Sequence, residues 1–214
     1  APVYTLLVSS RNRQESLLEG MDLRPSFIQR LPLARWWHEI YLPLFPLAVE
    51  SFYLTGFDLV ISSSHACAKG VIPAPEALHM CYCHTPARYA WDLSYFYARR
   101  VPWLLRGYMA VVMHRLRVWD ASTASRVDHF VANSHFVARR IARYYGRTAT
   151  VFYPPVDTAY FCPGESVSGD YCLTVSRLTA YKRIDLAVEA FNRLGRPLWI
   201  AGDGPERRRL QAVA

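Results

Sequence analysis

The sequence lacks a long apolar run, a metal-type cysteine pattern and a secretion signal. Its most apolar helical stretch, residues 101–112, is interrupted by Arg106 and is too short to span a bilayer. Its five cysteines have no zinc-site spacing, and their odd number excludes a fully paired disulfide scaffold. We therefore expect a cytoplasmic protein with reduced thiols.

Negative charge is the scarcer kind. The chain has 25 lysines and arginines against 17 aspartates and glutamates, a net charge of +8. This excess favours an anionic partner, whether nucleotide phosphates, a membrane surface or nucleic acid, and charge alone does not choose among them. Hydrophobic residues make up 52% of the chain, which excludes general disorder and permits a substantial core.

Short apolar runs alternate with helical patterns. The predicted strands are residues 3–8, 59–63, 79–83, 129–132, 150–153, 172–175 and 198–201, and the clearest helices are residues 104–125, 134–145 and 184–194. Most of these strands are continuously apolar, which is typical of strands buried on both faces of a parallel sheet. The alternation predicts βαβ units and a doubly wound α/β fold.

Proline, glycine and serine interrupt the alternation within residues 153–170, and it restarts with Tyr171. This predicts two domains, residues 1–153 and residues 154–214. We expect the second to be incomplete, because two strands and about two helices are too few for an open sheet.

The first motif that could bind a ligand follows the strand 172–175. The loop that begins at Ser176 carries Arg177 and Lys182 and leads into a helix. Ligands of doubly wound sheets bind beyond the carboxyl ends of strands, where a helix N-terminus attracts anions. Arg177 and Lys182 can converge there on a phosphate. The alternative is two surface cations on a loop.

A second loop of this kind follows the strand 198–201. Gly202 and Gly204 allow a tight turn and a close approach of a ligand, and Pro205 suits the first position of a helix. A plain strand-to-helix turn is the alternative. The two loops follow neighbouring strands and face one edge, so each strengthens the phosphate-site interpretation of the other.

The first domain has its own candidates at strand ends. His84 follows the strand 79–83, where a histidine can bond a sugar hydroxyl or a phosphate, or act as acid or base. A turn histidine that caps local backbone is the alternative. Arg88 and Tyr89 suit a sugar or a lipid phosphate, although core packing accounts for Tyr89 equally well.

Two further strand ends point to the same cleft. Asn133 and Ser134 end a strand and open a helix, so that their amides can face the cleft, although helix capping alone explains Ser134. His65 follows a serine-rich strand and can line the cleft as well. No Gly-x-Ser-x-Gly elbow is present, so a serine nucleophile is discounted.

Two segments combine cations with Trp and Leu, as interfacial membrane surfaces do. They are residues 99–106 and residues 32–45. The alternative is packing on the sheet, which we expect for the long helix and leave open for the other residues.

Several segments together resemble glycosyltransferase family 4. They are residues 53–70, 81–92, 127–140, 151–157, 175–185 and 201–206, and the most specific are Tyr-Cys-His-Thr-Pro, Val-Ala-Asn-Ser and Ser-Arg-Leu…Lys-Arg-Ile-Asp. Within the family, the chain looks most like bacterial mannosyltransferase-like members of polysaccharide assembly.

The resemblance implies two facing Rossmann-like domains, the GT-B arrangement, and retaining transfer of a hexose, with mannose from GDP-mannose as the leading candidate. It also implies that no metal or other cofactor is bound. The residues matched by Arg177 and Lys182 bind the donor diphosphate in this family, and the one matched by His84 lies near the transferred sugar. The turn matched by residues 202–205 lies near the nucleotide. The acceptor is a glycan or a lipid-linked glycan.

The sequence departs from the family pattern in two places. The family's first strand with its glycine-rich loop, and its paired-glutamate motif, have no counterpart between Ala1 and Ala214. We therefore expect an internal fragment that binds donor weakly and transfers nothing. Its first domain would lack one strand and expose apolar surface.

Two rival functions stay open. One is a sugar-nucleotide epimerase on the same fold, and the other is a non-catalytic basic module for a membrane or nucleic acid. The sequence shows no RNA-binding aromatic signature, so we expect no nucleic-acid partner. A cytoplasmic location, with peripheral contact to the inner face of an anionic membrane left open, completes the expectation.

Overall fold

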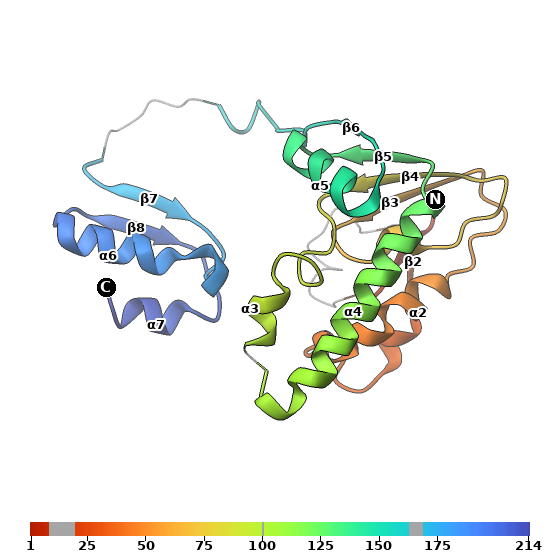
Figure 1. Ribbon diagram of the computed structural model, residues 1–214. Coiled ribbons are helices and arrows are strands. Elements are labelled where there is room, and N and C mark those ends of the chain that lie inside the picture. Colours follow the sequence, from red (N-terminus) through yellow and green to blue (C-terminus); the bar gives the residue numbers. More distant parts are fainter. Residues whose placement is uncertain (9–19, 100, 163–168) are drawn as a thin grey trace. The chain divides into compact units, whose positions relative to one another are not determined.

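A computed structural model describes residues 1–8, 20–99, 101–162 and 169–214 (Figure 1). The chain divides into two compact units, Ala1–Pro155 and Val156–Ala214. This division lies two residues after the end of the predicted first domain at residue 153.

The first unit is built on a four-stranded parallel sheet. Its strands are β3 (Leu59–Ser64), β4 (Leu78–Cys83), β5 (His129–Ala132) and β6 (Ala149–Val151), in that spatial order. Helices pack against this sheet, which is compatible with a Rossmann-like fold. The predicted α/β class is therefore confirmed.

A separate two-stranded parallel sheet pairs β1 (Val3–Thr5) with β2 (Leu23–Pro25). The prediction of a strand over residues 3–8 is too long, and β2 was not predicted. After β1, the backbone bonds to side chains instead of to a neighbouring strand. The Ser26 hydroxyl donates to the Leu6 carbonyl, and the Gln29 amide oxygen accepts from Val8 N at 2.7 Å.

Two helices carry most of the packing in this unit. Helix α4 (Arg106–Ser122) continues from the 3-10 turn η4 (Trp103–Leu105) into η5 (Thr123–Arg126), close to the predicted helix 104–125. Helix α5 (His135–Tyr145) ends at Gly146 in the left-handed region. The shorter helices are η1 (Phe27–Arg30), η2 (His38–Leu44), α2 (Phe45–Glu50), η3 (Ala68–Gly70) and α3 (Ser94–Ala98).

Only one face of the four-stranded sheet is packed. Cys81, Cys83 and Phe130 on that face meet Val137 and Ile141 of α5 in one cluster. On the opposite face Leu59 and Ile61 of β3 are 48% and 65% exposed. The prediction of burial on both faces is therefore wrong for β3, because no element in the described part of the chain covers that side. Exposed apolar surface on the first domain was expected and is present.

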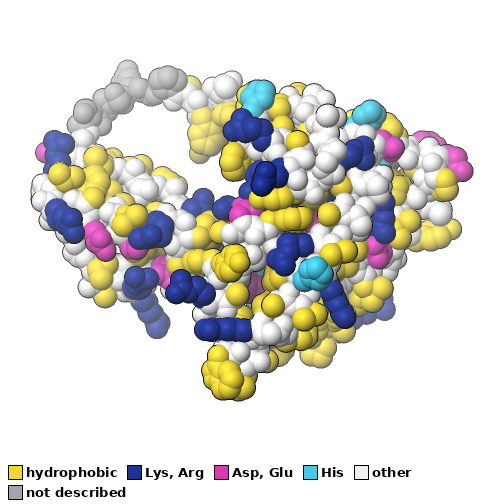
Figure 2. All heavy atoms as spheres, viewed as in Figure 1, with side chains coloured by type: hydrophobic (Ala, Val, Ile, Leu, Met, Phe, Trp, Pro, Cys, Tyr) yellow, Lys and Arg dark blue, Asp and Glu magenta, His cyan; other side chains and the backbone are white. Residues whose placement is uncertain are grey.

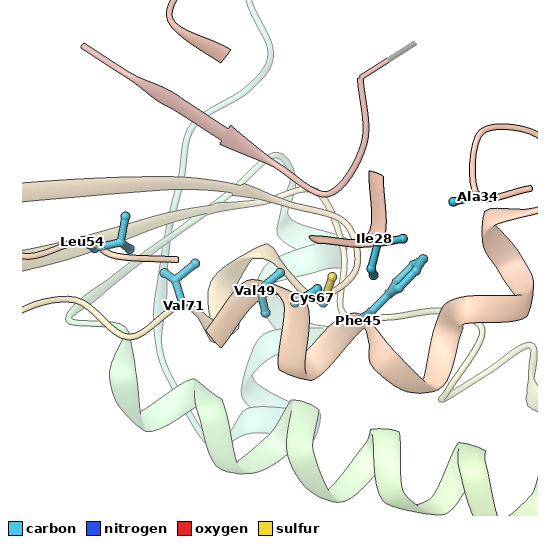
Figure 3. Close-up of a cluster of buried hydrophobic side chains, with 8 residues drawn as sticks. Ile28, Ala34, Phe45, Val49, Leu54, Cys67 and Val71 are labelled. Carbon is cyan, nitrogen blue, oxygen red and sulfur yellow. The ribbon is translucent and has the colours of Figure 1, made fainter. Parts of the chain in front are cut away.

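A second hydrophobic cluster lies beside β1 and α2. Phe45 and Val49 of α2 point toward Ile28 and Cys67 (Figure 3), and all four side chains are at most 8% exposed. Burial raises the pKa of the Cys67 thiol to about 12, so this cysteine behaves as a small apolar residue. All five cysteines are free thiols.

The largest fully buried side chain among the described residues is a lysine. Lys69 Nζ donates to Thr123 Oγ1 at 2.8 Å and to the Asp120 carbonyl, and it forms an ion pair with Asp120 Oδ1 at 3.1 Å. Asp120 Oδ2 accepts from Trp91 Nε1 at 2.8 Å and from Tyr145 Oη at 3.0 Å. This network ties η3, α4 and α5 together, and it was not predicted from the sequence.

A buried histidine gives the first unit a predictable pH response. His79 Nδ1 donates to the Arg126 carbonyl at 2.9 Å, so in the neutral ring Nε2 accepts from the Ser62 hydroxyl at 2.9 Å. Burial lowers the pKa of His79. The unfolded chain thus takes up a proton near pH 6.5 that the folded chain takes up only at a lower pH.

We expect the free energy of unfolding to fall as the pH falls below about 6.5, by up to about 1.4 kcal/mol per pH unit from this residue. Urea unfolding at several pH values measures it. His79→Gln should flatten this part of the curve, whereas His114→Gln, on an exposed residue of α4, should leave it unchanged. If His79→Gln had the same pH slope as the wild type, the pH dependence could not be assigned to His79.

The second unit holds two parallel strands, β7 (Cys172–Val175) and β8 (Leu198–Ala201). Its helices are η6 (Ala180–Lys182), α6 (Ile184–Leu194) and α7 (Arg207–Gln211). Leu178, Val188 and Leu210 form its small core. The predicted strands and the predicted helix of this unit are confirmed.

Candidate functional site

The two predicted donor loops lie side by side at the carboxyl ends of β7 and β8. Backbone hydrogen bonds continue the ladder beyond the strands: Ser176 N donates to the Ala201 carbonyl at 3.0 Å, and Leu178 N donates to the Asp203 carbonyl at 2.9 Å. Glu206 N then donates back to the Leu178 carbonyl at 3.1 Å. The loops therefore form one edge rather than two separate turns.

The glycines of the second loop make this approach possible. Gly202 and Gly204 have φ values of 146° and 156°. A Cβ at Gly202 would lie 1.9 Å from the Ser176 carbonyl oxygen, and one at Gly204 would lie 2.3 Å from that of Leu178. Pro205 was expected at the first helical position, but α7 begins at Arg207, because residues 203–206 complete the turn first.

We expect Gly202→Ala to destabilise the second unit by about 2 kcal/mol or more, because the added methyl group meets fixed backbone in a strained conformation. Hydrogen exchange of the β7 and β8 amides measures the loss. Gly195→Asn is the control, since Gly195 has φ 63° with open space around it and asparagine tolerates that region. Equal protection in both variants would contradict the close-approach role.

Arg177 and Lys182 both lie on the loop after β7, and both are exposed. Lys182 Nζ lies 5.7 Å from the centroid of the Tyr181 ring. The Ser176 hydroxyl donates to the Arg177 carbonyl at 3.3 Å. Two cations thus stand in solvent at the edge where a parallel sheet binds its ligands.

The N-terminus of α6 carries an ion pair. Arg183 adopts the left-handed conformation, with φ 53°, and its Nε donates to Asp185 Oδ1 at 3.0 Å. The hydrogen bond from Arg183 lowers the pKa of Asp185. A carboxylate in the first turn competes with an incoming anion for the helix end, so an anion at this edge would depend on the cations of the preceding loop.

A shallow pocket opens beside these loops, between η6 and α7. Its lining residues are Thr179, Ala180, Arg183, Ile184, Asp185, Glu206, Arg209 and Leu210. Thr179 Oγ1 is buried there without a hydrogen-bond partner among the described residues. Sequence reasoning missed Thr179 and Arg209; the one available signal was the spacing of charges at residues 206 and 209 on the second helix.

The first unit presents its own row of candidates. Ser64, Cys83, Ala132 and Val151 are register neighbours at the carboxyl ends of the four strands. His65, His84 and Asn133 each follow one of these positions directly. The structure therefore brings these three predicted residues to one edge of the sheet.

His84 is hydrogen-bonded to Ser63 of the neighbouring strand β3. Its Nε2 lies 2.9 Å from Ser63 Oγ, and its ring meets the Tyr82 ring edge-on with centroids 5.1 Å apart. Both His84 and Ser63 are exposed. His65, by comparison, is an exposed residue at the end of β3. His84 is thus held in one orientation by a hydroxyl while its ring remains open to solvent.

The remaining predicted residues have structural partners. The Ser134 hydroxyl accepts from Val137 N at 3.3 Å, which confirms it as the N-cap of α5, and it donates to Asn133 Oδ1 at 3.1 Å. Tyr89 packs against the cluster of Val112 and Met113, and burial raises the pKa of its phenol. Core packing therefore describes Tyr89.

Arg88 lies in a cation–carboxylate group. Its Nε is 3.7 Å from Asp92 Oδ2, and Arg140 grips both carboxylate oxygens of Asp92 at 2.5 and 2.7 Å. Desolvation raises the pKa of Asp92, but the bonds from Arg140 outweigh it and hold the pKa below its ordinary value. Arg88 therefore lies at the edge of the ion-pair group formed by Asp92 and Arg140.

The described residues contain no group of three or more histidines, cysteines, aspartates or glutamates arranged to hold a metal ion. The predicted site residues at the two edges include cations, hydroxyls and histidines. No protein-family model matches the chain, and a search of curated proteins finds no significant match.

Proposed function

We propose that the protein is a retaining glycosyltransferase that moves a hexose, mannose in the first instance, from a nucleotide-diphosphate sugar to a glycan or lipid-linked glycan. One observation carries the proposal. The loops after β7 and β8 are bonded into a single edge that bears Arg177 and Lys182, with exposed cations where a parallel sheet binds phosphate.

The proposed chemistry uses these cations in place of a metal. Charge develops on the diphosphate as the sugar–phosphate bond breaks, and Arg177 and Lys182 stabilise it there. The acceptor then attacks from the face that the leaving phosphate occupied, with that phosphate as the base. His84, oriented by Ser63, contacts the transferred sugar.

The proposed architecture is that of GT-B enzymes. The first unit, with His84 at its sheet edge, supplies the acceptor side, and the second unit supplies the donor side. The resemblance to family 4 across the chain supports this division. A cytoplasmic location, where nucleotide sugars are made, belongs to the same proposal.

Product analysis tests the reaction class. In the full-length enzyme, labelled hexose should leave the donor only when an acceptor is present. An epimerase would convert the donor without an acceptor, and either that conversion or inert donor under both conditions would count against glycosyl transfer. A salt-sensitive nucleic-acid complex tighter than any complex with a sugar nucleotide would favour the basic binding module instead.

In the full-length enzyme, we expect His84→Ala to lower transfer by about 10²-fold or more while leaving nucleotide binding within about twofold, because the residue acts at the sugar and not at the phosphates. Turnover and calorimetric titration measure the two effects. His129→Ala is the control, since His129 is an exposed histidine at the opposite end of the strands. Equal loss of transfer and binding in His84→Ala would give His84 a structural role.

A further inference from the structure

The start of α4 presents apolar side chains to solvent. Trp103, Leu104 and Leu105 of η4 are 74%, 72% and 52% exposed, and Tyr108 and Val111 of α4 are 61% and 51% exposed. We call these five residues the α4 surface. The expectation that the long helix packs on the sheet is therefore wrong for its first turns.

Helix α4 has two apolar stripes. Val112, Met113 and Leu116 form the buried stripe, which packs in the cluster of Ala87 and Ala90. Leu104, Tyr108 and Val111 recur at spacings of four and three residues, so they form a second stripe on another side of the helix. The buried stripe packs in the core, whereas the second stripe makes no contribution to that cluster.

Another exposed apolar group adjoins the same helix. Leu42 of η2 packs against the buried stripe of α4, which places η2 beside it. Trp36, Trp37 and Ile40, just before Leu42, are 75%, 61% and 63% exposed. Exposed apolar side chains thus occur both at the start of α4 and just before Leu42.

The stretch of chain that contains the α4 surface carries charge of one sign, whereas the exposed Glu39 lies between Trp37 and Ile40. Residues 93–119 contain five arginines and no aspartate or glutamate. Arg99, Arg106 and Arg115 are exposed. Figure 2 shows Lys or Arg and hydrophobic side chains together at the lower end of the first unit, where α4 begins in Figure 1.

We propose that the α4 surface docks on an anionic lipid bilayer. Trp and Tyr side chains prefer the headgroup region, and Leu and Val reach the acyl boundary. Each arginine near an anionic surface adds attraction that falls with salt. A protein partner would need paired carboxylates for these arginines, whereas a bilayer of anionic lipids supplies phosphates at every lateral position. None of the helices in the described residues is long and apolar enough to cross a membrane.

Vesicle sedimentation tests this surface independently of glycosyl transfer. At low salt, the protein should sediment with vesicles of phosphatidylcholine and phosphatidylglycerol and remain in solution with phosphatidylcholine alone. Trp103→Ala/Leu104→Ala should weaken the partition coefficient by at least about tenfold. Arg106→Gln should weaken it by about fivefold at low salt and have little effect at high salt.

The control variant is Tyr160→Ala/Phe161→Ala, which removes two side chains that are 78% and 69% exposed in the second unit. It should bind vesicles as the wild type does, and circular dichroism should show that all variants are folded. Equal binding to neutral vesicles, or no binding to either kind, would overturn the proposal. Self-association that Trp103→Ala/Leu104→Ala abolishes, without vesicle binding, would assign the surface to a second copy and overturn it as well.

Discussion

Lys69→Met is expected to lower the free energy of unfolding of the first unit by about 3–5 kcal/mol. The substitution removes the cation that faces the Asp120 carboxylate, and both side chains are at most 2% exposed. The carboxylate then keeps its bonds to Trp91 and Tyr145 but has no charge partner. Chemical denaturation followed by circular dichroism measures the loss.

A double-mutant cycle separates the ion pair from simple packing. Asp120→Asn keeps an oxygen that can accept from Trp91 and Tyr145 but removes the charge. The double variant should lose less unfolding free energy than the two single variants lose together, because it leaves neither buried charge unpaired.

The chain offers a matched control, since Lys69 and Lys182 are its only lysines. Lys182→Met makes the same substitution on an exposed side chain and should change stability by no more than about 0.5 kcal/mol. Strict additivity in the cycle would show that Lys69 and Asp120 do not interact.

Arg177→Ala and Lys182→Ala are each expected to weaken binding of a nucleoside diphosphate by about 10–100-fold. A hydrogen bond to a charged group contributes about 1.5–3 kcal/mol, and each variant removes the cation that makes such bonds to the phosphates. In a transfer assay, turnover should fall further, because charge grows on the diphosphate in the transition state. Calorimetric titration measures the binding effect.

Arg196→Ala is the control for these variants. It removes one exposed positive charge from the residues just before β8, at the opposite end of the same strands. Unchanged affinity in this variant would show that position and not net charge decides binding. If Arg177→Ala and Lys182→Ala behaved as Arg196→Ala does, the loop after β7 would have no part in phosphate recognition.

The elements with strong local patterns could be predicted from the sequence. Helix α6 has apolar residues at helical spacing over one face, and its predicted bounds, residues 184–194, are those observed. Strand β2 could not be found, because Leu23-Arg24-Pro25 has no strand pattern of its own. It forms only because β1 lies beside it. The exposed face of β3 was missed for a related reason, since an apolar run does not show what covers it.

The candidate site divides in the same way. Arg177 and His84 lie within two residues of the ends of apolar strands, and Lys182 lies on the segment that follows Arg177, so the sequence alone placed them near sheet edges. The Ser63–His84 bond joins residues 21 positions apart on neighbouring strands, and the Lys69–Asp120 pair joins residues 51 apart. Such pairs depend on register and helix packing, which no local pattern encodes.

The most direct test compares a nucleoside diphosphate with the corresponding monophosphate in calorimetric titrations of the protein. The edge formed by Arg177 and Lys182 should bind the diphosphate at least about tenfold more tightly. Combining Arg177→Ala with Lys182→Ala should abolish the difference, and Arg196→Ala should retain it. Equal affinity of the wild-type protein for the two nucleotides, or no binding of either, would contradict a diphosphate-sugar donor site.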